Sequence, residues 1–214
     1  RLLTVTGVQT CALPIYAMAR IITTKLTEVL GEPFVIENRA GAAGNIAAEF
    51  VAKSPPDGYT LFMGFSTVMT TNKALYKSMA IDPVRDFSPI TQIATSQYLL
   101  VVHPSLPVRT VRELVALAKA KPGQLNYSSA GIGSPLHLSG ELFKARAGVN
   151  IVHIAYKGGG PAAAAVLSGE SQITFPSVAA ALQFVETGKL RALAVTGLKR
   201  SVLAPKLPTM DESG

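Results

Sequence analysis

The residues best suited to bind a ligand lie in one glycine-rich stretch, Tyr156-Lys157-Gly158-Gly159-Gly160-Pro161. An apolar run at 151–155 precedes it and an alanine-rich run at 162–167 comes after it, a pattern that predicts a strand, a turn and a helix. Three glycines let the backbone approach a ligand without a Cβ, and Pro161 suits the first turn of a helix. The helix start offers N–H groups and a positive dipole end, which bind carboxylate or phosphate without a catalytic side chain. A plain strand-to-helix turn has the same spacing, so the stretch alone leaves both interpretations open.

Two further loops share this character. Gly64-Phe65-Ser66-Thr67 and the stretch from Ser128 to Pro135 each follow a predicted strand, precede a predicted helix and combine glycine with hydroxyl side chains. In open α/β sheets, ligands bind beyond the carboxyl ends of the strands. Backbone N–H groups and hydroxyls at that edge suit a carboxylate, so the sequence predicts a binding site and not a reaction centre.

The side chains that could carry catalysis are not arranged for it. Ser66 and Ser134 lack the G-x-S-x-G pattern of a nucleophile elbow, and the three histidines lack the spacing of an H-E-x-x-H metal site. His153 alternates within a strand, which favours a packed residue, whereas His137 falls in the first turn of a helix beside a serine loop and is a candidate pocket residue. We therefore expect no catalytic residue, metal ligand or cofactor. A small α/β hydrolase using Ser134 and His137 is the less favoured alternative.

The composition indicates a packed α/β protein. Of the 214 residues, 48% are hydrophobic and 15% are charged, which excludes a disordered chain. The net charge of +7 comes from Lys and Arg that occur singly, without the blocks of like charge that would favour nucleic-acid binding. This basic balance suits an acidic ligand. No run reaches the roughly 18 apolar residues of a membrane span.

The two chain ends differ from the rest of the sequence. The stretch from Val5 to Ile15 resembles an in-frame translation of a sequencing adapter, and its pattern does not continue into the helix predicted at 18–30. We therefore expect residues 1–16 to be a non-native, disordered artefact. Cys11, the only cysteine, would then be foreign to the natural protein, which would have no disulfide or thiolate metal site. The last residues, 209–214, resemble the start of a helix, so the chain is predicted to be truncated at both ends and to have lost any signal peptide.

The pattern along the chain predicts two α/β lobes. Strands and helices alternate as in a parallel sheet with helical crossovers, and Pro104 and Pro107 indicate a crossing between domains. We place the first lobe at 17–103 and 194–214, and the second at 104–193. Thr110 is predicted to cap the helix that follows it. Predicted helices cover 18–30, 46–53, 72–76, 111–119, 136–145, 162–167 and 178–186, and predicted strands cover 34–38, 59–63, 90–94, 98–102, 125–128, 151–155, 171–175 and 190–195.

Six motifs then connect the sequence to a known family. They are VIENRAGAAGN (35–45), PPDGYTLFMG (55–64), LVVHPSLPVRTV (100–111), LNYSSAGIGSPLHLSGELF (125–143), IVHIAYKGGGPA (151–162) and GKLRALAVTGLKRS (188–201). In type and order they resemble the periplasmic solute-binding proteins of tripartite tricarboxylate transporters, the Bug receptor family. The resemblance covers residues 18–214. It implies an α/β, two-lobed type II periplasmic-binding-protein-like (flytrap) fold, whose lobes close on a small carboxylate in the cleft between them.

One departure from the family pattern affects the fold. The family's first strand and a proline-glycine-glycine loop should precede Met18, but Ile15-Tyr16-Ala17 stands there. We therefore expect the central strand of the first lobe and one wall of the pocket to be absent, and the chain to be weakly stable.

In the family, loop amides, hydroxyls and bridging waters hold the carboxylate. The resemblance implies that the matching positions bind the ligand here, and none of them is expected to be catalytic or to bind a metal. These positions are Ser66, Thr67, Ser129, Gly131, Ser134, His137, Tyr156, Lys157, Gly158, Gly159, Gly160, Pro161, Ala162 and Ser177.

The resemblance also implies a function and partners. The protein would be a periplasmic monomer, would capture a small organic carboxylate by closing hinges near 101–107 and 194–197, and would deliver it to the membrane permease subunits of the transporter. Nucleic acid is not an expected partner. A receptor that reports the ligand to a signalling partner is an alternative that the sequence does not separate from this one.

Overall fold

The computed structural model of the chain describes residues 3–8, 12–39 and 41–214. By its internal contacts the chain divides into two compact units. Unit 1 comprises Arg1–Thr91 together with Gly131–Ser134, and unit 2 comprises Gln92–Ala130 and Pro135–Gly214. No helix in the described part of the chain is long and apolar enough to cross a membrane.

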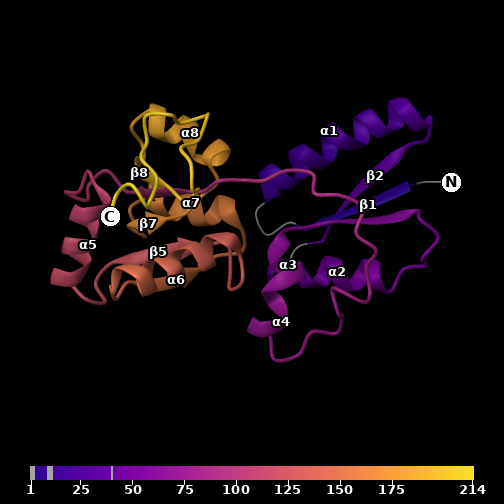
Figure 1. Cartoon of the computed structure of the whole chain (residues 1–214), viewed down its shortest axis with the longest axis horizontal. Helices are drawn as coiled ribbons and strands as arrows, with labels where there is room; N and C mark the ends of the chain where they lie inside the picture. Colours follow the sequence, from indigo (N-terminus) through magenta and orange to yellow (C-terminus); the bar gives the residue numbers. More distant parts are fainter. Residues whose placement is uncertain (1–2, 9–11, 40) are drawn as a thin grey trace. The chain divides into compact units, whose positions relative to one another are not determined.

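Unit 1 is a three-stranded parallel sheet with helices on both sides. The strands are β1 (Leu3–Val8), β2 (Phe34–Arg39) and β3 (Thr60–Met63), in the order β2-β1-β3. The long helix α1 (Ala12–Leu30) and the shorter α2 (Asn45–Ala52) lie on opposite sides of the sheet (Figure 1). The remaining elements are η1 (Ala42–Gly44), α3 (Ser66–Thr70) and α4 (Asn72–Leu75).

The N-terminal stretch corrects two of our expectations. Residues 1–16 were predicted to be disordered, and the central strand of the first lobe was predicted to be absent. Both predictions were wrong for the described residues, because β1 pairs with β2 on one side and β3 on the other, and α1 begins at Ala12. The physical reason is that residues 3–8 supply a run of extended backbone between two strands that both need a partner. Cys11 lies outside the described residues.

The predicted strand at 90–94 does not form either. The segment between α4 and β4 contains no strand, and Ile90 and Ile93 are 78% and 46% exposed. No neighbouring strand pairs with this segment, so an extended conformation would not bury the two isoleucine side chains. Apolar composition alone was therefore a misleading signal.

Unit 2 is a five-stranded mixed sheet in the order β6-β5-β7-β4-β8. β5 runs parallel to β6 and β7, whereas β4 runs antiparallel to β7 and β8. Its strands are β4 (Leu99–Val102), β5 (Asn126–Ser129), β6 (Val152–Ala155), β7 (Ile173–Thr174) and β8 (Arg191–Val195). Its helices are α5 (Val111–Ala120), α6 (Pro135–Ala147), α7 (Gly159–Leu167) and α8 (Val178–Glu186).

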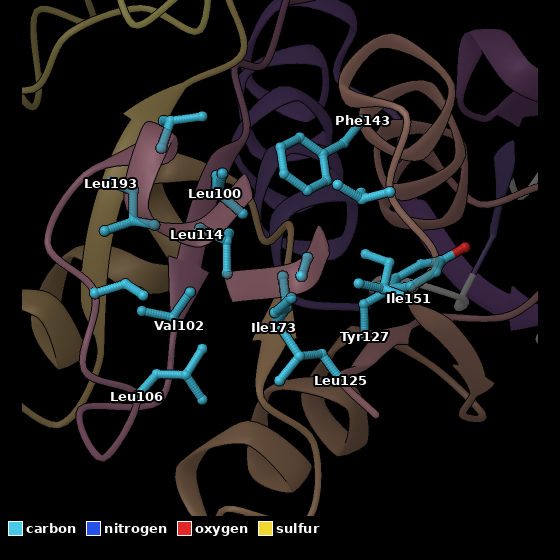
Figure 2. Close-up of a cluster of buried hydrophobic side chains, with 14 of the residues drawn as sticks. Leu100, Val102, Leu106, Leu114, Leu125, Tyr127, Phe143, Ile151, Ile173 and Leu193 are labelled. Atoms are coloured by element: carbon cyan, nitrogen blue, oxygen red, sulfur yellow. The ribbon is translucent and has the colours of Figure 1, made fainter. Parts of the chain in front are cut away.

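The core of unit 2 is built on the alternation of side chains along β4. Leu100 and Val102 face a cluster that includes residues of α5 and α6 (Figure 2), and Leu99 and Val101 face a second cluster with residues of α7 and α8. All four side chains are fully buried. α5 begins with the expected cap, since the Thr110 hydroxyl accepts the N–H of Glu113 and the Glu113 carboxylate reaches back to the N-cap.

The two units do not coincide with the predicted lobes. Residues 194–214 belong to unit 2 and not to the first lobe, because β8 pairs with β4 and Val195 forms a bridge with Thr209. Residues 92–103 also belong to unit 2, since they lead into β4. The predicted hinge segments at 101–107 and 194–197 therefore lie inside one unit.

Candidate functional site

In unit 2, three strands end at the same edge of the sheet. β5 is parallel to both β6 and β7, so the carboxyl ends of the three strands, at Ser129, Ala155 and Thr174, point the same way. Each strand leads through a short loop into the N-terminus of a helix, α6, α7 or α8. Three helix N-termini at one edge create a positive environment of backbone N–H groups, which is suited to an anion.

The loop after β6 leads to a helix start without a side-chain cap. Gly158 is the N-cap of α7 with φ 120°, a conformation that favours glycine. The first N–H groups of a helix have no acceptor within the helix, and here they belong to Gly159 and Gly160. Pro161 comes next, and its missing N–H would be unpaired in any case. The backbone of α7 therefore presents two N–H groups that can donate hydrogen bonds to a carboxylate.

Other predicted residues of this loop are engaged in its support. The hydroxyl of Tyr156 donates to Glu170 at 2.7 Å, and its N–H donates to the Ser129 carbonyl at 2.9 Å. Ala162 is fully buried, and its carbonyl accepts the Ser128 hydroxyl at 2.8 Å. Lys157 is exposed and takes part in none of the ion pairs found among the described residues. Of these side chains, Lys157 is the one placed to meet an anion.

Ser177 acts as a helix cap. It is the N-cap of α8, and its hydroxyl accepts the Ala180 N–H at 3.4 Å. The N–H of Val178 donates to the Gln97 carbonyl at 3.0 Å, so this helix start is already partly satisfied. Ser177 is buried, and its position is that of a structural residue at the same edge of the sheet.

Ser129 belongs to a cluster of polar side chains on β5, β6 and α6. Its hydroxyl lies 2.6 Å from Nε2 of His153, and Ser129 itself is fully buried. The His153 ring stacks on Tyr127, with centroids 4.8 Å apart, and lies 4.4 Å from the ring of His137. Two histidines that sequence reasoning treated separately, one as packing and one as a pocket residue, are thus in contact.

α6 completes this cluster with a charged pair. Glu141 accepts the Tyr127 hydroxyl at 2.6 Å and Lys144 Nζ at 2.8 Å. Gly140 allows this close approach, because a Cβ at that position would overlap the Tyr127 ring. The cluster therefore connects α6 to the strands β5 and β6, which lead into the predicted site loops.

The cluster shifts the pKa values of its members. Burial, with a smaller contribution from His137, lowers the pKa of His153 to about 4, and burial also lowers the pKa of His137. Burial would raise the pKa of Glu141, but hydrogen bonds from Lys144 and Tyr127 outweigh it, and that pKa is lowered. At neutral pH, both imidazoles are therefore uncharged and the carboxylate is ionised.

The remaining predicted residues belong to unit 1. Ser66 and Thr67 open α3 directly after β3 and Phe65. Ser66 is exposed, whereas Thr67 is only 7% exposed and its hydroxyl has no hydrogen-bond partner within the described part of the chain. Gly131 and Ser134 belong to unit 1 by their contacts, and the Ser134 hydroxyl donates to the Gly131 carbonyl at 2.7 Å.

A buried asparagine of unit 1 was missed by sequence reasoning. Asn72 is fully buried, and its amide donates to Asn45 Oδ1 at 2.7 Å, while its own Oδ1 has no partner among the described residues. A Cβ at Gly133 would lie 2.9 Å from this oxygen. A single asparagine in a short helix gives no sequence signal of such a position.

A hollow of unit 2 lies away from these loops. It has a volume of about 450 Å³ and is lined by residues 104–109, Glu113 and Arg191. β4 ends beside it and runs antiparallel to β7, so it lies at the opposite edge of the sheet from the helix N-termini. Arg191 donates to the carbonyls of Leu106 and Val108 at 2.9 Å, which indicates that it supports this turn. In the described residues, no group of three or more His, Cys, Asp or Glu side chains could hold a metal ion.

The fold defines a class: an α/β protein of the periplasmic-binding-protein type, here with glycine-rich loops at the carboxyl ends of parallel strands. The structure of the periplasmic binding protein BugD has this fold, with a TM-score of 0.87 and 31% identity, over 100% of this chain and 71% of that one. Residues 18–214 match the family described as tripartite tricarboxylate transporter family receptor. The chain belongs to this family, which is one of binding proteins and not of enzymes.

Two solved structures of similar proteins contain a carboxylate. R. palustris Rpa4515 with adipate is 40% identical, with a TM-score of 0.92, over 99% of this chain and 71% of that one. MatC from Rhodopseudomonas palustris with bound malate is 30% identical, with a TM-score of 0.88, over 99% and 72%. The chain spans 58% and 61% of the length of two curated relatives, to which it is 36% and 37% identical. They are a protein encoded in the tcbD-tcbE intergenic region of Pseudomonas sp. and the protein BugT of Bordetella pertussis.

Proposed function

We propose that this protein is a periplasmic receptor that captures a small organic carboxylate and delivers it to the membrane permease subunits of a tripartite tricarboxylate-type transporter. The observation that carries the proposal is the start of α7, where the N–H groups of Gly159 and Gly160 have no side-chain cap and lie beside the exposed Lys157. A carboxylate accepts hydrogen bonds from such groups and benefits from the positive end of the helix dipole.

A second observation, in unit 1 by itself, also supports a ligand. The buried hydroxyl of Thr67 has no partner in the described residues of unit 1. A buried polar atom without a hydrogen bond costs about 1–3 kcal/mol, so such atoms are normally paired with a ligand, a water or another group. Thr67 comes after a strand of unit 1 in the same way that the glycine loop comes after β6 in unit 2.

The ligand class is inferred from the relatives and from the chemistry of the loops. Adipate and malate, found in two related structures, are both dicarboxylates. Backbone N–H groups recognise a carboxylate of any such acid, and the rest of the pocket selects among them. We infer that the ligand of this protein is a small mono- or dicarboxylate.

A thermal-shift series tests the proposal. Adipate and malate are compared with adipamide, which has the length of adipate but no charge. At 100 times Kd a ligand adds about 2.7 kcal/mol of stability, which raises Tm by about 5–10 °C for a chain of this size. A rise with at least one carboxylate and none with adipamide supports the proposal. A rise with the neutral analogue alone contradicts it.

A further inference from the structure

Two loops of the proposed site are joined at Ser129. It is the last residue of β5, and its carbonyl accepts the N–H of Tyr156, the first residue after β6, at 2.9 Å. The loop that leads to α6 begins at the next residue. Any displacement of Ser129 therefore moves the starting points of both loops.

The side chain of Ser129 is bonded to a histidine of the neighbouring strand. Its hydroxyl lies 2.6 Å from His153 Nε2, across two adjacent strands whose register pairs Tyr127 with His153 and Ser129 with Ala155. Because Ser129 is fully buried, we assign it a role in holding the two loops rather than in contacting a ligand. The imidazole in turn contacts the rings of Tyr127 and His137.

We propose that His153 is a positioning residue for the proposed carboxylate site, holding Ser129 and through it the starts of the Tyr156 loop and of the loop before α6. The proposal rests on the proposed function for its effect on affinity. The groups that face His153 are Tyr127 and Ser129 on β5, and three residues of α6: His137, Glu141 and Lys144.

The neutral form of His153 suits this role. A proton on the ring would add a second cation near Lys144, while Glu141 is already engaged by Lys144 and by the Tyr127 hydroxyl. Burial, with a smaller contribution from His137, lowers the pKa of His153 to about 4. His153 is therefore uncharged at neutral pH, the form in which its Nε2 pairs with the Ser129 hydroxyl.

Three substitutions separate this role from simple packing. His153→Phe keeps a flat ring against Tyr127 and His137 but cannot bond Ser129. His153→Gln restores a hydrogen-bonding group, and Ser129→Ala removes the other partner. Circular dichroism and Tm establish that each variant is folded before it is compared.

The first readout needs no ligand. Amide hydrogen exchange at Tyr156, whose N–H donates to the Ser129 carbonyl, is measured in the free protein, and exchange at the far end of unit 2, in α5, serves as the internal control. We expect about tenfold faster exchange at the loop in His153→Phe and Ser129→Ala, and near wild-type rates in His153→Gln. Unchanged exchange in His153→Phe would overturn the proposal.

The second readout is affinity for adipate, measured by calorimetry at pH 7.5, where both the ligand and the His153 ring are in a single protonation state. We expect His153→Phe and Ser129→Ala each to weaken binding about tenfold, and the double variant to be no weaker than either. Additive losses in the double variant, or wild-type affinity in His153→Phe, would contradict the proposal.

The two readouts keep this proposal apart from the proposed function. If neither adipate nor malate binds the wild-type chain, the carboxylate function fails, and exchange at the loop alone decides whether His153 positions it. If adipate binds and the exchange rates of all variants are equal, the function stands and the role of His153 is refuted.

Discussion

A buried hydroxyl without a partner among the described residues is unusual, and Thr67 has one. Thr67→Val replaces it with a side chain of the same shape. We expect the free energy of unfolding of the free protein to stay the same or to rise by about 0.5–1 kcal/mol, because an unpaired buried hydroxyl is removed. Carboxylate affinity should fall about tenfold or more, since a hydrogen bond to a charged group contributes about 1.5–3 kcal/mol.

Thr70→Val in the same helix is the matched control. The Thr70 hydroxyl is exposed and donates to the Ser66 carbonyl at 2.9 Å, so it is not available to the site. Urea unfolding and calorimetric titration measure both variants. If Thr67→Val binds the ligand as tightly as the wild type, Thr67 does not contact it.

The histidine cluster predicts acid sensitivity. The pKa of His153 is about 4 in the folded protein and about 6.5 in the unfolded chain, so the unfolded chain takes up a proton first as the pH falls. The stability that neutral His153 contributes is present above pH 6.5 and is lost between pH 6.5 and pH 4. Because the ring is only partly buried, we expect a loss of about 1–2 kcal/mol, less than the full shift would give.

Urea denaturation at a series of pH values measures this loss. The lowered pKa of Glu141 acts in the same direction, but its contribution is lost at lower pH. His153→Gln should flatten the curve between pH 6.5 and pH 4. Equal slopes for the wild type and the variant would show that His153 is not the group responsible.

At the residue scale, the sequence shows some of these positions and hides others. The glycines at 158–160 are visible because three in succession before a proline are rare and have a direct backbone meaning. The pair of Ser129 and His153 is hidden, because residues 24 apart meet only through the register of β5 and β6. Asn72 is hidden for the same reason, since its partner Asn45 lies 27 residues away.

At the scale of elements, α7 offers a substitution pair that separates charge from shape. A Cβ at Gly160 would meet no atom within 4 Å, and the residue is exposed. Gly160→Ala should therefore be tolerated and should stabilise the helix by up to about 1 kcal/mol. Gly160→Asp should also stabilise it, by about 0.3–1 kcal/mol through the helix dipole, but its carboxylate occupies the place of the ligand.

The two variants differ in their expected binding. We expect Gly160→Ala to bind within about threefold of the wild type, and Gly160→Asp to lose at least about tenfold in affinity while its Tm does not fall. Thermal unfolding and titration on the same samples measure both quantities. Loss of binding in both variants would point to a steric effect, and loss in neither would place the anion elsewhere.

Most helices and strands could be predicted, and the exceptions have physical causes. The cap of α5 was visible in Thr110 and Glu113, three residues apart. Residues 90–94 have the composition of a strand but no neighbouring strand, so they stay irregular. Pairing between strands is a property of the whole sheet, and a window of five residues does not contain it.

At the scale of the whole molecule, β1 is the main departure from the sequence-based expectations. Residues 3–8 were set aside with the stretch that resembles an adapter translation, whose pattern does not continue into the next helix, yet they form the central strand of unit 1. The hydrogen bonds that pair β1 with β2 and β3 are formed by backbone groups, which any extended segment of the right length possesses. A sequence motif reflects side chains, so it carries little information about this pairing.

A proline in this strand tests its role. Val5 pairs with Ile36 on one side and Leu61 on the other, and Val5→Pro would remove the N–H of that position and distort the strand. We expect unit 1 to lose about 3 kcal/mol or more of stability. Hydrogen exchange of the β2 and β3 amides should accelerate, and the amides of unit 2 in the same sample should not change. Unaltered exchange in β2 and β3 would show that residues 3–8 do not pair there.

The measurement that tests the central claim most directly is a titration of the 15N-glycine-labelled chain with adipate, followed by NMR. The chain has 18 glycines, few enough to resolve and assign. We predict that the N–H signals of Gly158, Gly159 and Gly160 shift most and saturate together, and that adipamide does not reproduce this. Saturating shifts confined to other glycines, with the three signals of the α7 loop unchanged, would contradict the claim.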